Sequence, residues 1–104
     1  MTFAAGTPGS ADDVTIYSGD APFAFRILDV TLLTSTLIAL STAQLRDTAG
    51  GGGAALSSAM TTAVVGTARN NDTATPTVAA NGSVFLRRSD QGVAGEVIIL
   101  AVKT

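Results

Sequence analysis

The segment PFAFRILDVTLLTS, residues 22–35, decides the fold class of this chain. Its large apolar residues fall on every second position, which is the spacing of a β-strand with one face toward a core. They occupy first one phase and then the other: Phe23, Phe25, Ile27, then Leu28, Val30, Leu32. A change of phase within a strand indicates a β-bulge, whereas a strand buried on both faces needs no single phase. Both interpretations predict a long strand here.

Shorter segments of the same kind flank this strand and are separated by Gly, Pro, Asn and Asp, the residues that favour turns. We expect further strands within these ranges: 12–20, 36–47, 61–70, 83–89 and 95–104. In the segment 36–47, Leu37, Leu40 and Leu45 are expected to be the buried residues. The segment 54–60 is compatible with a short strand or with a single helical turn.

No segment carries apolar residues at helical spacing over three turns, so we expect an all-β chain. Roughly seven short strands joined by turns indicate an antiparallel β-sandwich. The pair Asn81-Gly82 predicts a tight hairpin between the two runs that flank it. The chain has 104 residues, enough for one domain, which we place at 12–104. Residues 1–11 are mostly Gly, Ala, Thr, Pro and Ser around Phe3, and they predict an extended N-terminal arm.

The composition argues against several classes of function. The chain has no Cys and no His, which removes thiolate chemistry, histidine acid–base catalysis and the usual zinc ligands. Its net charge is −2 with only six Lys and Arg, which argues against binding through nucleic-acid phosphates. The longest apolar-looking run without charges, residues 30–45, is too short to cross a bilayer and is interrupted by Thr, Ser and Gln. We therefore expect a soluble chain without signal peptide, enzymatic activity, nucleic-acid partner or membrane segment.

The run DTAGGGGAALSSAM, residues 47–60, holds four consecutive glycines. A phosphate-binding loop needs a Lys beside its glycines and a Ser or Thr directly after that Lys. The nearest Lys here is Lys103, and no long amphipathic helix follows the glycines. We therefore expect the tip of a mobile hairpin, a turn rather than a phosphate site. If this tip touches a partner, Gly51 and Gly52 are the candidate contact residues.

The acidic residues form no evident catalytic or metal site. Those at expected turns are Asp12, Asp13, Asp20, Asp47, Asp72 and Asp90. They are too dispersed for a calcium loop, and turn stabilisation by their side chains explains them better. Asp29 and Glu96 lie inside expected strands, where two carboxylates could serve glycoside hydrolysis. An outward charge or an ion pair with Arg26, Arg87 or Arg88 is the simpler interpretation, and we expect no metal, cofactor or catalytic residue.

The C-terminal strand is apolar on both faces. Its residues divide into two phases, Ile98, Leu100, Val102 and Val97, Ile99, Ala101. The outer face of a solitary two-layer sandwich is expected to be polar. Either this strand is packed on both faces within its own fold, or the N-terminal arm, a sister subunit or a larger surface covers one face. The candidate partner contacts are Phe3, the expected anchor of the arm on a neighbour, and Val97, Ile99 and Ala101.

Four segments in this order resemble the small decoration (cement) and head-fibre proteins of tailed-bacteriophage capsids: FRILDVTLL, AQLRDTAGGGGAALSSAM, TVAANGSVFLRR and GVAGEVIILAVKT. The resemblance covers most of residues 22–104 and rests on loose patterns of glycine turns and alternating strands. It implies a jelly-roll-like antiparallel β-sandwich without catalytic residues. It also implies a structural protein that assembles in the host cytoplasm, binds the major capsid protein on the virion surface and stabilises the shell. We expect it to act as a homo-oligomer, a trimer or a dimer.

A second class of function stays open beside capsid decoration. A receptor- or carbohydrate-binding module of a phage fibre can also be a β-sandwich. Such modules usually stack sugars on exposed aromatic rings. This chain has no Trp, and Tyr17 is its single Tyr. The expected function is therefore capsid decoration, with the binding module as the alternative.

Overall fold

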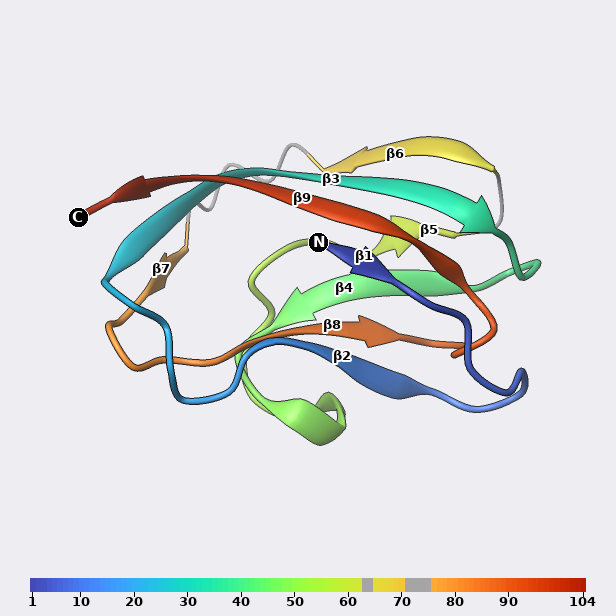
Figure 1. Ribbon diagram of the computed structural model, residues 1–104, viewed down its shortest axis with the longest axis horizontal. Coiled ribbons are helices and arrows are strands. Elements are labelled where there is room, and N and C mark those ends of the chain that lie inside the picture. The colour runs from blue at the N-terminus through green and yellow to red at the C-terminus, as the bar shows by residue number, and fades with distance from the viewer. Residues whose placement is uncertain (63–64, 71–75) are drawn as a thin grey trace.

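The computed structural model describes residues 1–62, 65–70 and 76–104, which form β-strands and one short 3-10 turn (Figure 1). The strands are β1 (Thr2–Phe3), β2 (Asp12–Tyr17), β3 (Phe25–Thr36), β4 (Thr42–Arg46), β5 (Met60–Thr61), β6 (Gly66–Asn70), β7 (Thr77–Val78), β8 (Val84–Arg88) and β9 (Ala94–Lys103), and the turn η1 is Ala49–Gly51. All the strand pairs described are antiparallel. The prediction of an all-β antiparallel sandwich is confirmed.

The strands form two sheets that lie face to face. Sheet A has the order β1-β9-β3-β6, and β7 pairs with the start of β3 beyond the end of β6. Sheet B has the order β2-β8-β4-β5. In Figure 1, β3 and β9 of sheet A run along the top, and β8 and β2 of sheet B run along the bottom. Most neighbouring strands are distant in the sequence, so the sheets depend on long-range pairing.

β3 contains the bulge that one of the two interpretations predicted. Its register against β9 shifts between Ile27 and Asp29, which leaves Leu28 without an opposite residue. Ile27 is 3% exposed, whereas Leu28 is 39% exposed. After the shift, Val30 and Leu32 are buried again. The bulge therefore keeps both phases of the apolar pattern directed at the same core, and burial on both faces is not needed to explain it.

The core lies between the two sheets and consists mainly of aliphatic side chains. Its most deeply buried members are Val30, Leu32, Leu45, Val84, Leu86 and Val93. Burying one such side chain contributes about 1.5–3 kcal/mol relative to leaving it in water. Val30, Leu32 and Leu45 alternate with less buried residues along β3 and β4. Period-two spacing therefore predicts these strands correctly.

The turn at Asn81-Gly82 is present, but the predicted hairpin is wrong. Asn81 has a φ of 60°, and the Gly82 N–H donates to the Ala79 carbonyl at 2.9 Å, as in a tight turn. The strand before this turn, β7, pairs with β3 in sheet A, whereas β8 after it pairs with β2 and β4 in sheet B. The turn carries the chain from one sheet to the other. A two-residue signal specifies local backbone geometry and leaves the strand partners open.

The strand expected at 36–47 is present only as β4, which begins at Thr42. Leu45 is fully buried as predicted, but Leu37 and Leu40 are exposed, Leu40 to 97%. Leu40 also has a φ of 63°, in the left-handed region that side chains such as leucine rarely adopt. The prediction is wrong for these two residues because they lie in the turn between β3 and β4, where apolar spacing continues without burial.

The remaining expected strands differ from the structure mainly in their ends. The segment 54–60 takes the short-strand alternative, since Ala55 bridges to Arg46 and the last residue of the segment begins β5. The strand expected at 61–70 is present as the end of β5 and as β6. The following loop with Asp72 was predicted for residues that lie mostly outside the described part of the chain.

The N-terminal segment 1–11 lies along its own domain, which corrects the prediction of an arm that reaches onto a neighbour. β1 pairs with β9, and Phe3 is 5% exposed within the core of the same chain. Further along, the Gly6 N–H donates to the Gln91 carbonyl at 2.6 Å. Removing the segment would take Phe3 out of the core. Its small polar residues gave no sign of this, because the free sheet edge that it pairs with is created by distant strands.

Candidate functional site

The outer faces of the two sheets differ in chemistry. On sheet B the outward positions include Thr15, Gln44 and Arg87, and η1 packs against this face. Phe85, opposite Thr15, is the large apolar residue on this face, and it is only 9% exposed. On sheet A, β9 presents three exposed aliphatic side chains at successive outward positions: Ile98 at 45%, Leu100 at 58% and Val102 at 40%. We call these three residues the apolar row. The polar face is thus partly covered by the chain itself, while the apolar face is open.

No described residue forms a third layer over the apolar row. The N-terminal segment pairs with the edge of β9 at Gly95 and Glu96 and does not cross its outer face. Leu28, at the bulge of β3, adds a fourth exposed aliphatic side chain beside the row. The row is one strand wide, because the β3 residues opposite Ile98, Leu100 and Val102 are Thr31, Asp29 and Arg26. Exposed apolar side chains gathered in this way often mark an interaction site. The apolar row is therefore the candidate docking surface.

The contact residues suggested on β9 lie on the opposite phase from this row, and for Val97 the suggestion is wrong because its side chain lies in the core. Val97 is 2% exposed in the core, and Ile99 is partly buried against the core. Ala101 is exposed and lines a cavity at the edge of the sandwich. The apolar character of both phases was predicted correctly. Because both phases are apolar, the sequence offered no means of choosing the inward one.

A cavity of about 510 Å³ opens between the two sheets, and residues of β9 on sheet A and of β2 on sheet B line it from opposite sides. Most of its lining is apolar and comes from both sheets, with Ile16, Phe25 and Ile99 among the residues that contribute. At its rim the Nζ atom of Lys103 lies 5.1 Å from the centroid of the Phe23 ring, a cation–π contact. The described residues that line this cavity include no carboxylate. It offers contact to apolar groups rather than acid–base chemistry.

The glycine run forms the connection between β4 and the bridge at Ala55, as a hairpin tip should. The Gly50 N–H donates to Asp13 Oδ2 at 2.8 Å, and Arg46 Nη2 donates to the Gly53 carbonyl at 2.9 Å. These bonds hold the tip against sheet B. The Asp13 carboxylate also occupies the glycine N–H that a phosphate would need, which speaks against an anion site.

Ala substitutions are expected to distinguish the two glycines proposed as contacts. Gly51→Ala should lower the free energy of unfolding by about 1–2 kcal/mol, because Gly51 has a φ of 79°. Gly52→Ala should change it by less than about 0.5 kcal/mol. Gly52 has a φ of −88°, and nothing lies within 4 Å of an added Cβ. Urea denaturation measures both values, and equal effects would contradict this tip conformation.

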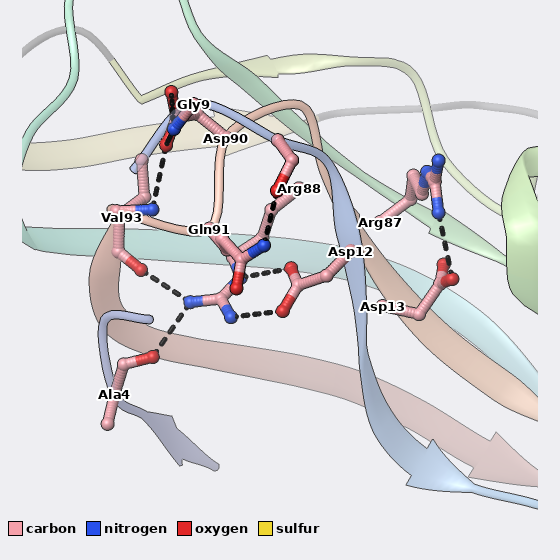
Figure 2. A network of polar contacts seen from close by, with 11 residues as sticks. Ala4, Gly9, Asp12, Asp13, Arg87, Arg88, Asp90, Gln91 and Val93 are labelled. Atoms are coloured by element: carbon pink, nitrogen blue, oxygen red, sulfur yellow. Dashed lines mark hydrogen bonds and ion pairs between the residues drawn. The ribbon is translucent and has the colours of Figure 1, made fainter. Parts of the chain in front are cut away.

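A buried arginine ties the N-terminal segment and the β8–β9 connection to sheet B (Figure 2). Arg88 is 5% exposed, and its Nε and Nη2 atoms donate to the two carboxylate oxygens of Asp12 at 2.7 and 2.6 Å. Its Nη1 atom donates to the carbonyls of Ala4 at 2.8 Å and Val93 at 2.6 Å. The guanidinium carbon also lies 5.6 Å from the centroid of the Phe3 ring. Arg88 is therefore a structural clamp, with its donors directed at the protein itself.

The sequence offered Arg87 and Arg88 as ion-pair partners of Asp29 or Glu96, but the structure pairs them with Asp13 and Asp12. Arg87 Nη1 lies 2.9 Å from Asp13 Oδ2, beside the Arg88 pair. The antiparallel register of β2 and β8 sets Asp12 opposite Arg88 and Asp13 opposite Arg87. The sequence did show two adjacent acids and two adjacent arginines in separate expected strands. This pattern predicts the two ion pairs only when β2 and β8 are known to pair.

The acidic residues in the described part of the chain do not converge on one centre. Asp20, Asp47 and Asp90 each accept a backbone N–H in their own turns, from Ser18, Ala54 and Gly92 at 2.7, 2.8 and 2.8 Å. In sheet A, Asp29 is opposite Leu100, and Glu96 lies four residues from Leu100 along β9. That separation is about 13 Å at the usual strand rise, beyond the spacing of paired glycosidase carboxylates. Among the described residues, no three His, Cys, Asp or Glu side chains gather as a metal-binding group.

Comparison with known proteins identifies no relative. No family model matches the chain, and no curated protein and no solved structure matches it significantly. Within the described residues, no helix is long and apolar enough to cross a membrane. A functional proposal therefore rests on the apolar row, the cavity and the sequence resemblance.

Proposed function

We propose that this chain is a non-catalytic structural protein that binds the outer surface of a tailed-bacteriophage capsid, contacts the major capsid protein there and stabilises the shell. The apolar row carries the proposal. Docking removes aliphatic surface from water, which is favourable by roughly 25 cal/mol per Å². Only 13% of the residues are charged, against about 25% in typical soluble domains, which also suits a protein held on a lattice.

We further propose that the sandwich is a jelly roll. With β7 set aside, β1 pairs with β9, β2 with β8, β3 with β6 and β4 with β5. This is the pairing of one long hairpin with the glycine run near its tip. Rolling that hairpin brings β9 beside β3 and β8 beside β4, as observed. Jelly rolls occur in viral capsid and lectin domains, so this topology supports a virion protein without selecting its partner.

The direct test is binding to shells assembled from the major capsid protein of the same phage genome. We expect the purified chain to sediment with these shells and to raise the temperature at which they disassemble. Leu100→Ser should weaken binding about tenfold or more, because Leu100 is the most exposed member of the apolar row. Titration of shells with chain, followed by sedimentation, measures the affinity.

The matched control is Thr15→Ala on the outer face of sheet B, which should bind shells like the unmodified chain. Circular dichroism and the melting temperature should show that both variants fold. Unchanged binding of the Leu100→Ser variant would remove the apolar row as the docking surface. If the chain ignores shells and binds a soluble oligosaccharide instead, the fibre-module alternative is correct.

A further inference from the structure

The edge of sheet A is only partly paired. β1 begins at Thr2, and the residue before it, Met1, donates its amino group to the Val97 carbonyl at 2.8 Å and accepts the Val97 N–H at its carbonyl at 2.9 Å. Figure 1 shows this end of β1 beside the middle of β9, while the rest of β9 continues toward the C-terminus. Backbone groups alternate sides along a strand, so Ile99, Ala101 and Lys103 direct their N–H and C=O toward the same edge. No described strand pairs with them there.

This open edge lacks the usual protection against strand pairing. Natural edge strands carry charges, prolines or bulges that prevent another strand from adding to them. Residues 97–102 have no charge and no proline, and the register shifts between β3 and β9 insert their extra residues in β3. Charges lie only at the two ends of this segment: the Met1 amino group is bonded to the Val97 carbonyl, and Lys103 lies over the Phe23 ring. The edge is regular, apolar and free to pair.

Both faces of the free segment are also apolar. Ile98, Leu100 and Val102 are exposed on the outer side. On the inner side, Ile99 and Ala101 line the cavity between the sheets. A strand added at this edge would shield apolar side chains on both sides of sheet A from water, in addition to satisfying the free backbone groups.

We propose that the partner at this edge is a second copy of the same chain, joined through antiparallel pairing of the two β9 strands about a twofold axis at Ala101. In this register Ile99 is opposite Lys103 of the second copy, and Ala101 is opposite itself. It is the register that uses the free N–H and C=O groups of all three edge residues. The two Lys103 side chains stay at opposite ends of the paired segment, so like charges do not meet.

The second copy fits this edge because the segment is self-complementary. A twofold interface brings one patch against itself, which requires that the patch carry matching donors, acceptors and apolar groups. The free segment of β9 meets these requirements and continues the antiparallel pairing that β1 begins. The dimer would also set two apolar rows side by side. The inference rests on this edge alone and does not depend on the capsid proposal.

A cysteine at the proposed axis tests the pairing directly. The chain contains no Cys, so Ala101→Cys introduces a single thiol. Directly opposite residues in a hydrogen-bonded antiparallel pair have Cα atoms about 5.5 Å apart, within the range of a disulfide. With oxidised glutathione, we expect disulfide-linked dimers to form at least about tenfold faster than with the Thr15→Cys control on sheet B. Non-reducing gel electrophoresis over time measures both rates.

Sedimentation equilibrium of the unmodified chain provides a second readout. We expect the unmodified chain to dimerise with a dissociation constant below about 0.1 mM. The Ala101→Lys variant should be a monomer, because it places like charges at the axis. The melting temperature of a diluted Ala101→Lys sample should match that of unmodified monomer, since Ala101 is exposed. A monomeric unmodified chain, equal disulfide rates, or an oligomer that persists in the Ala101→Lys variant would each overturn the proposal. If the unmodified chain is a monomer, the open edge would instead be a site for a strand of another protein.

Discussion

Replacing Arg88 with Met is expected to lower the free energy of unfolding by about 3 kcal/mol. Arg88 is 5% exposed and donates to Asp12, Ala4 and Val93, so its loss leaves a carboxylate and two carbonyls without their donor. Breaking a buried ion pair from one side typically costs about 3–5 kcal/mol. We expect the lower end because the Asp12 side chain is 31% exposed and keeps contact with water. Chemical denaturation with a linear extrapolation gives the value.

Arg87→Met is the matched control for this prediction. The neighbouring Arg87–Asp13 pair has the same charges, but Arg87 is 29% exposed and Asp13, at 14%, keeps the Gly50 N–H as a donor, so the loss of Arg87 should cost about 1–2 kcal/mol. Arg88→Lys should recover only part of the stability, since an ammonium group cannot hold both oxygens of Asp12 and both carbonyls in the same geometry. Equal losses for the Arg87 and Arg88 variants would show that Arg88 is not a clamp.

Leu32→Ala is expected to lower the free energy of unfolding by about 3 kcal/mol. Leu32 lies in the middle of β3 and has no exposed surface. Truncating a buried leucine removes its transfer free energy and leaves a cavity, at a typical cost of about 2–5 kcal/mol. Thermal or urea unfolding followed by circular dichroism measures the loss.

The adjacent residue provides the control, because neighbours on a strand point to opposite faces. Leu33 lies on the outward phase of β3 and is only partly buried, so Leu33→Ala should cost less than about 1 kcal/mol. A larger loss for Leu33 than for Leu32 would mean that the inward and outward faces of β3 are assigned the wrong way round.

The strands were predictable from local pattern because each must bury one face. In β4, buried Ala43 and Leu45 alternate with Gln44, which is only partly buried. The same reasoning was wrong at Leu37 and Leu40, where apolar residues continue into a turn. Period-two spacing reports which residues could be buried, and an opposing sheet decides which of them are.

The sequence did not predict which distant strands pair with one another. Asn81-Gly82 specified a turn, yet the strands on either side of it join different sheets. Phe3 was recognised as an anchor, but its site is the core of its own chain rather than that of a neighbour. Arg88 was visible as a charge, and its role depends on Asp12 of β2 and Ala4 of the N-terminal segment being brought beside it.

The last strand separates what the sequence determined from what the tertiary structure decided. By itself, the sequence determined that β9 is a strand with two apolar faces and no charge between Val97 and Val102. Only the tertiary structure decided that Val97 and Ile99 face inward, that the apolar row faces outward and that the edge beyond Val97 is open. Inward and outward are defined by the second sheet, and an edge is open only where no other strand pairs with it. Both conditions depend on long-range contacts, which a local pattern does not contain.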